Sequence, residues 1–216
     1  MLIGSATATG CVREPEPCLL ELAEGDLVLT ELRGPQQGPD SRGEWFEIYN
    51  ATDDNLDLLG LRGVLTSLRG TQQRDFLVRE SLVVTPGQYV VLGSLPLDPS
   101  VRPEIDYSFN ADFRQDPSFE DTDGLVLPDD ADADPMELFS SARVELRACG
   151  QVIDSFVYAD LPVEGTYGFD GAMMPDAEAN DVATRWCVDD TPPPTEGPQT
   201  ALGLPGSPGE VNRPCG

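Results

Sequence analysis

Proline and glycine interrupt this sequence every few residues, and no stretch has the pattern of a long amphipathic helix. The 216 residues include 20 Pro and 21 Gly, and short runs rich in Val, Leu, Phe and Tyr stand between them. Proline lacks the amide proton that a helix interior needs, so frequent prolines and glycines favour short strands joined by turns. Strand-sized apolar runs with this spacing are typical of a β-sandwich or β-barrel. We therefore expect an all-β fold.

The apolar runs define the expected strands. The first is "DLVLTEL" (Asp26–Leu32), and the sequence "ARVELRACGQVIDSFVYA" predicts a hairpin that turns at Cys149-Gly150. The remaining expected strands lie in "EWFEIYN", "NLDLLGLRGVL", "RDFLV" and "YVVLG", and weaker ones lie at 166–169 and 184–188. From Asp189 onward we expect coil.

The chain is expected to form one domain. A flexible lead covers residues 1–24, the β-domain covers 25–213, and 214–216 form a short tail. An acidic insertion at about 95–135 interrupts the domain: its segment 104–134 carries eleven acidic residues against Arg114 alone, with one expected short strand in "DGLVL". This segment has too few apolar residues to bury a core of its own.

The charge excludes several functions. The chain has 39 acidic residues against 13 basic ones, its net charge is −26, and it contains neither His nor Lys. A surface this negative repels phosphate, which argues against nucleic-acid binding, and it favours divalent cations or basic partners. Without His and Lys there is no Ser-His-Asp triad, His-ligated zinc site or Schiff-base lysine. Carboxylate-only hydrolysis and an oxygen-ligated metal site remain open.

The start of the sequence, "MLIGSATATGC", places small residues directly before Cys11. This resembles the end of a bacterial lipoprotein signal peptide, in which that Cys carries the lipid, although the basic and apolar regions of such a peptide are missing. The alternative is an unstructured N-terminal tail. No stretch approaches the roughly 20 apolar residues of a membrane span, so we expect membrane attachment only through a lipid at Cys11.

With Cys11 set aside, four cysteines allow three connectivities. We expect Cys18–Cys215, which would join the two ends of the domain, and Cys149–Cys187, which would join two segments of its body. Reduced structural thiols are the alternative.

The stretch "GEWFEIYN" combines three aromatic residues with two carboxylates. Alternation along a strand places Phe46 and Ile48 on one face, and Trp45 and Glu47 on the other. Glu44 lies on the opposite face from Glu47, so these two cannot flank one bond as a catalytic pair. The pattern predicts a strand with apolar surface on both sides.

The following stretches occur in this order along the chain: "LVLTEL", "GEWFEIYN", "DLLGLRGVL", "TPGQYVVL", "GQVIDSFVY", "RWC" and "GSPGEVN". Together they resemble the motifs of the lamin-tail domain family. The resemblance runs from about residue 25 to 212, with Leu61 at a usual Trp position and the acidic insertion outside the pattern. It implies an immunoglobulin-like β-sandwich and a role in binding or structure. It transfers no catalytic residues, because the family defines none.

The run "PDDADADP" suggests a metal site. Asp130, Asp132 and Asp134 alternate like the first ligands of a calcium loop, and "FEDTDG" could add Glu120, Asp121 and Asp123. The run lacks the glycine and the distal Glu of an EF-hand. The alternative is a solvated acidic loop.

Four further residues are interpreted as structural. Trp45 and Trp186 could stack on sugar rings, but both fall at motif positions that packing explains. Asp154 lies within an apolar strand and needs a partner, either backbone N–H groups or an arginine such as Arg147 or Arg185. The same holds for Glu47.

Together these features predict a non-catalytic binding or structural module of the bacterial cell envelope. It would be exported and would recognise a protein or an envelope glycan. The alternatives are a calcium-dependent adhesion or matrix protein that uses the acidic insertion, and a carboxylate-only hydrolase.

Overall fold

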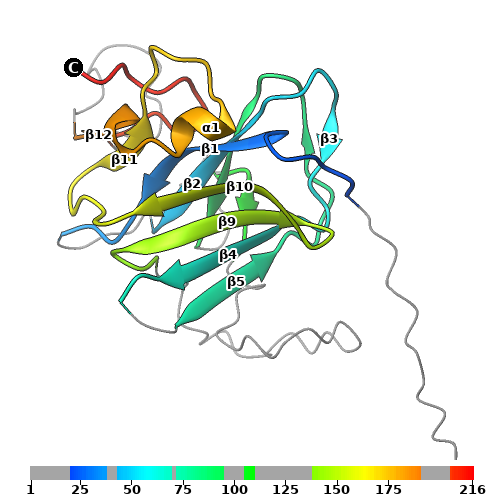
Figure 1. The fold of residues 1–216 in the computed structure, drawn as a ribbon, viewed down its shortest axis with the longest axis horizontal. Helices are drawn as coiled ribbons and strands as arrows, with labels where there is room; N and C mark the ends of the chain where they lie inside the picture. The colour runs from blue at the N-terminus through cyan, green and yellow to red at the C-terminus, as the bar shows by residue number, and fades with distance from the viewer. Residues whose placement is uncertain (1–19, 38–42, 70–71, 95–104, 110–137, 191–204) are drawn as a thin grey trace, which may run out of the picture.

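The computed structural model describes residues 20–37, 43–69, 72–94, 105–109, 138–190 and 205–216. These residues form two main sheets and a small third one (Figure 1). The described helical segments are the single turn α1 (Ala177–Asn180) and the 3-10 turn η2 (Ala183–Arg185). Among the described residues, no helix is long and apolar enough to cross a membrane. The all-β prediction is confirmed.

The larger sheet has six strands in the order β12-β11-β1-β2-β7-β8. Their bounds are Trp186–Asp189 for β12, Thr166–Phe169 for β11, Leu27–Arg33 for β1, Trp45–Asn50 for β2, Tyr89–Gly93 for β7 and Tyr107–Ser108 for β8. All neighbours are antiparallel except β7 and β8, which run parallel. The register of β1 shifts between Leu29 and Glu31, where Thr30 forms a β-bulge.

The second sheet has four strands in the order β10-β9-β4-β5. Their bounds are Gln151–Tyr158 for β10, Ala142–Ala148 for β9, Arg62–Ser67 for β4 and Gln73–Leu77 for β5. The predicted hairpin is present as β9 and β10. Cys149 and Gly150 both have positive φ, 51° and 78°, as the two central residues of a type I′ turn require. Strands β3 (Leu56–Asp57) and β6 (Val83–Val84) form the small third sheet.

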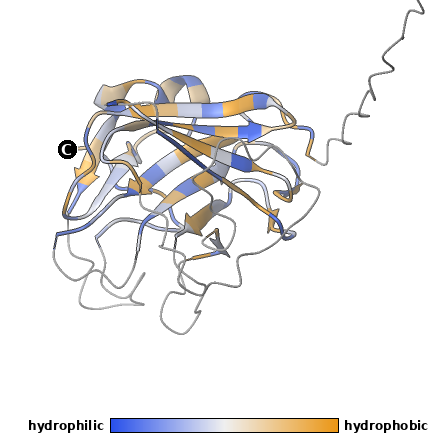
Figure 2. Cartoon of the chain, turned by 90° about the horizontal axis from the view of Figure 1, so that it is seen from below, coloured by the Kyte–Doolittle hydropathy of each residue, from blue (hydrophilic) through white to orange (hydrophobic). Residues whose placement is uncertain are grey.

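The two main sheets share one hydrophobic core. Apolar and polar residues are interspersed along their strands (Figure 2). Strand β9 alternates between buried and more exposed residues as a half-buried strand does, whereas every residue of β1 is buried. Two aromatic groups connect the sheets. Phe46 of β2 lies 5.2 Å from Phe76 of β5, and Trp186 of β12 stacks at 3.9 Å on Phe156 of β10 (ring centroids).

Part of the predicted acidic insertion is buried in the fold. Ile105, Tyr107 and Phe109 are buried, and the ring of Phe109 stacks at 4.4 Å on that of Phe76. Tyr107 lies in β8, a strand that the sequence did not reveal because it is two residues long. The expected strand at Asp123–Leu127 lies outside the described residues.

Candidate functional site

A row of paired residues crosses the outer face of the six-stranded sheet. Glu47 of β2 is opposite Glu31 of β1, Glu31 is opposite Gly168 of β11, and Gly168 is opposite Cys187 of β12. Paired residues point to the same side of a sheet. Phe46, Ile48 and Trp186, the sequence neighbours of these residues, point into the core. We refer to Glu47, Glu31, Gly168 and Cys187 as the cross-strand row.

The C-terminal segment, residues 205–216, covers this row. The N–H of Ser207 donates to Oε1 of Glu31 at 3.1 Å, and the N–H of Gly209 donates to Oε2 of Glu47 at 2.6 Å. Both carboxylates also accept hydroxyl hydrogen bonds, Glu31 from Thr166 and Glu47 from Thr30. Glu31 is 1% exposed and Glu47 is fully buried. Their oxygens are therefore occupied by groups of the protein itself.

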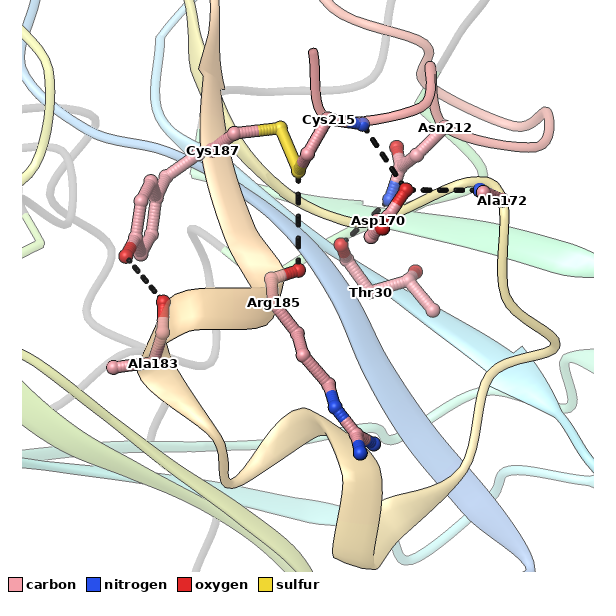
Figure 3. Close-up of a disulfide and its surroundings, with 9 residues drawn as sticks. Thr30, Asp170, Ala172, Ala183, Arg185, Cys187, Asn212 and Cys215 are labelled. Carbon is pink, nitrogen blue, oxygen red and sulfur yellow. Dashed lines mark hydrogen bonds between the residues drawn. A yellow bond between two sulfur atoms is a disulfide. The ribbon is translucent and has the colours of Figure 1, made fainter.

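The rest of the segment follows the row toward β12 (Figure 3). The side chain of Asn212 donates from Nδ2 to the carbonyl of Thr30 at 2.7 Å, and a Cβ on Gly168 would come within 3.3 Å of it. The carbonyl of Arg213 accepts from the N–H of Gly171, and the carboxylate of Asp170 accepts from the N–H of Cys215 at 3.0 Å. The segment is therefore held along its length, where the sequence predicted only coil.

A disulfide completes the attachment. Cys187 bonds to Cys215 with a Cα–Cα distance of 5.8 Å, and Figure 3 shows the bond beside Arg185 and Asp170. The predicted pairs Cys18–Cys215 and Cys149–Cys187 are therefore wrong. Cys187 lies on the edge strand β12 next to the C-terminal segment, whereas Cys149 lies at the turn of the β9–β10 hairpin in the other sheet.

Cys149 is also disulfide-bonded, to a partner outside the described residues. Its Sγ lies 3.1 Å from the carbonyl oxygen of Leu20, which places the hairpin turn beside the start of the described chain. Cys11 and Cys18 lie outside the described residues, so lipidation of Cys11 stays a prediction.

Burial makes the two carboxylates weak acids. It raises the pKa of Glu31 from its ordinary value of 4.5 to about 7, against the hydrogen bonds from Thr166 and Ser207, which lower it. The pKa of Glu47 is raised well above its ordinary value, first by burial and then by the neighbouring charge of Glu31. Two carboxyl groups on one row in a site closed to water do not both ionise readily. The pair therefore keeps its protons to higher pH than exposed carboxyl groups do.

Asp154 of β10 occupies a second polar site, at the β1 bulge between the two sheets. It is 3% exposed and accepts from the N–H of Leu29 and from Nδ2 of Asn180, both at 2.7 Å. Asn180 also donates to the carbonyl of Leu29. A bulge leaves backbone groups without ladder partners, and these side chains supply them. Burial raises the pKa of Asp154 to about 7, and the hydrogen bond from Leu29 opposes the rise.

The hydrogen bonds that Asp154 accepts come from Leu29 and Asn180 and not from the arginines named from the sequence. Arg147 instead pairs with Glu145, at 2.6 Å. Glu44, the other acidic residue of the "GEWFEIYN" stretch, is 7% exposed and accepts from the N–H of Leu138 and thus ties β2 to the segment before β9.

Neither tryptophan is placed to stack on a sugar. Trp45 is fully buried with Val91 and Ile105 in a small cluster on the outer face of the six-stranded sheet. Trp186 is 5% exposed, stacks on Phe156, and donates from Nε1 to the carbonyl of Asn180 at 2.6 Å. The structure gives both residues packing positions.

A cavity of about 210 Å³ lies between the C-terminal segment and β12. It is lined by Glu31, Gly168, Cys187, Val188, Asp189, Asn212, Arg213, Pro214 and Gly216. Glu47 is not among the residues that line it.

No group of three or more His, Cys, Asp or Glu side chains in the described part of the chain could hold a metal ion. The predicted calcium ligands Asp130, Asp132 and Asp134 lie outside the described residues. That site stays a prediction.

The sequence analysis did not identify Glu31 as a site residue. Within the described residues, Glu31 and Glu47 are the only two carboxylates that lie directly opposite each other on paired strands. The sequence separation of 16 between Glu31 and Glu47 carries no local signal, because their proximity depends on the register of β1 against β2 across the bulge. The signal that could have found the site is the "GSPGEVN" motif, whose Ser207, Gly209 and Asn212 make the contacts to the sheet.

No protein-family model matches this sequence, and no curated protein matches it significantly.

Proposed function

We propose that this chain is a non-catalytic binding or structural module of the bacterial cell envelope, exported and built as a lamin-tail-like, immunoglobulin-like β-sandwich. The observation that carries the proposal is the use of its buried carboxylates. Glu31, Glu47 and Asp154 each accept hydrogen bonds from backbone amides and polar side chains that hold strands and the C-terminal segment together.

A carboxylate-only hydrolase needs two carboxyl groups that flank a bond of the substrate. Glu31 and Glu47 are adjacent, but both lie beneath the C-terminal segment, and their oxygens are bonded to Ser207, Gly209, Thr166 and Thr30. This arrangement supports a structural role for the two carboxylates. Recognition of a partner would then take place on the outer surfaces of the sandwich.

The disulfides support export. Cys187 and Cys215 are joined, Cys149 is also disulfide-bonded, and structural disulfides persist mainly in oxidising compartments. An extracellular or periplasmic location agrees with the lipoprotein-like sequence around Cys11.

The family resemblance supports the same proposal through the position of its motifs. "GEWFEIYN" supplies β2 at the centre of the larger sheet, and "GSPGEVN" supplies the contacts between the C-terminal segment and β1 and β2. The motifs thus fall where two parts of the fold are joined.

Co-sedimentation with isolated bacterial envelopes tests the proposal. The disulfide-bonded domain should sediment with envelopes and stay in the supernatant without them. Prior digestion of the envelopes with a protease or with a glycan hydrolase then separates a protein partner from a glycan partner.

A domain that stays in the supernatant under all of these conditions would contradict the proposal. So would turnover of an envelope glycan that is lost in Glu47→Gln while the variant keeps its fold.

A further inference from the structure

Two tyrosines and a methionine form a surface patch at one end of the six-stranded sheet. Tyr49 of β2 is opposite Tyr89 of β7, their ring centroids are 4.8 Å apart, and both are half-buried. The hydroxyl of Tyr49 lies 3.4 Å from Sδ of Met174, which is 74% exposed. We refer to Tyr49, Tyr89 and Met174 as the aromatic patch. It borders the cross-strand row, because Tyr49 and Glu47 share a face of β2.

The chain segments around this end of the sheet carry acidic residues and no arginine. The carbonyl of Asp26 accepts from the N–H of Ala51, and a Cβ on Gly25 would contact Ala177 of α1, so these segments lie close together. The turn 85–89 joins them through hydrogen bonds of Gly87 and Gln88 with Asn50. Within 24–26, 51–54, 85–89 and 173–178 the acidic residues are Glu24, Asp26, Asp53, Asp54, Asp176 and Glu178.

We propose that the aromatic patch and its acidic surroundings form the docking surface for a basic, arginine-rich or lysine-rich segment of a partner protein. This inference rests on the proposed binding function and gives it a location and a class of partner.

The choice of a basic partner follows from charge and ring chemistry. Guanidinium and ammonium groups bind to the faces of tyrosine rings, and nearby carboxylates strengthen that attraction. No arginine among the described residues is placed over either tyrosine ring, whereas Arg74 lies 4.3 Å from the ring centroid of Phe139 elsewhere in the fold. The net charge of −26 steers cationic partners toward the protein. Tyrosine is also enriched at the centres of protein interfaces, and methionine adapts to different partners.

The test is fluorescence anisotropy with a labelled oligo-arginine peptide and, separately, with an oligo-glutamate peptide of the same length. The wild-type domain should bind the first and ignore the second. Tyr49→Ala and Tyr89→Ala should each weaken binding about tenfold, because each removes a ring from the centre of the surface. Tyr49→Phe and Tyr89→Phe keep the rings and should bind as wild type does.

Two matched controls separate this surface from diffuse attraction. Val157→Ala removes an exposed apolar side chain from the other sheet and should change nothing. The double variant Asp53→Asn, Asp54→Asn removes two charges from the segments around the aromatic patch. It should weaken binding more than the double variant Asp160→Asn, Glu164→Gln does, because Glu164 lies just before β11, at the opposite end of the larger sheet.

Equal affinities for wild type and the two alanine variants would overturn the inference, as would equal effects of the two charge changes. An alanine variant that fails to fold is recognised by its melt, and the phenylalanine and asparagine variants then carry the test. If envelopes retain the domain while no variant alters peptide binding, the proposed function stands and this docking surface is wrong.

Discussion

Glu31 and Glu47 lie directly opposite each other on β1 and β2, and each accepts a backbone hydrogen bond from the C-terminal segment, Glu31 from Ser207 and Glu47 from Gly209. A segment without strand structure is thus attached to the centre of the larger sheet by two buried acids. The disulfide at Cys215 secures its far end. Stability, pH response and redox state of the domain should therefore all depend on this attachment.

Stability should fall as pH rises. The folded state holds protons on Glu31 and Asp154 up to about pH 7, and on Glu47 above its ordinary range, whereas the unfolded chain releases them near pH 4 to 4.5. Between these values the folded state binds more protons, so the free energy of unfolding decreases with pH. For Glu31 alone the loss between pH 4.5 and 7 is on the order of 3 kcal/mol. Urea melts at several pH values measure it.

The control for this prediction is Glu31→Gln, whose stability should depend less on pH than that of wild type over the same range. Protonation of surface carboxylates at low pH reduces charge repulsion in both proteins equally, so it cancels when their stabilities are compared. Hydrogen bonds lower the pKa values of Asp57 and Asp170, so these two carboxylates stabilise the folded state above their ordinary pKa of 3.8 and lose that contribution only as the pH falls below it. Parallel pH profiles for wild type and Glu31→Gln would contradict the assignment.

Asp154→Ala should destabilise the domain by about 2–4 kcal/mol, because it leaves the N–H of Leu29 and one N–H of the Asn180 amide buried without an acceptor. Asp154→Asn keeps an acceptor oxygen and should cost clearly less. Chemical denaturation of both variants measures the difference. Equal losses would show that the carboxylate is not the acceptor on which the β1 bulge depends.

Removing the Cys187–Cys215 disulfide should lower stability by about 3–4 kcal/mol, because the bond closes a loop with a sequence separation of 28. The double variant Cys187→Ser, Cys215→Ser should therefore unfold at lower urea concentration than wild type. Adding a reductant to this variant should lower stability further, since Cys149 is also disulfide-bonded. A double variant as stable as wild type would mean that hydrogen bonds alone hold the segment.

Gly171→Ala should displace the C-terminal segment. A Cβ at this position would lie 1.6 Å from the backbone oxygen of Asn212, and that oxygen cannot move without shifting the segment. We expect a loss of at least about 2 kcal/mol, typical of strong overpacking. Gly216→Ala is the matched control, because a Cβ there meets nothing within 4 Å. If both variants melt at the wild-type temperature, the close packing of the segment on Gly171 is wrong.

The fold was largely predictable because it depends on local patterns. Alternation and turn residues gave the strands at 27–33, 45–50 and 89–93, and the Cys149-Gly150 dipeptide gave the hairpin turn. The strand β8 was missed because two residues carry no periodicity.

The site was less predictable because its contacts connect distant parts of the sequence. Glu31 and Ser207 are 176 residues apart, and no spacing rule relates them. The disulfide pairing failed for the same reason, since four cysteines fix only the set of connectivities, and the position of β12 beside the C-terminal segment selects among them. The "GSPGEVN" motif marked the segment, but only the structure showed which carboxylates it binds.

Native-state hydrogen exchange at the amide of Gly209 tests the central claim most directly. If Glu47 holds the C-terminal segment on the sheet, this amide should exchange as slowly as those of β1, and Glu47→Ala should accelerate it while the β1 amides stay protected. Exchange at the rate of an exposed loop in the wild-type protein would contradict the account. The segment would then not be held by the carboxylates beneath it.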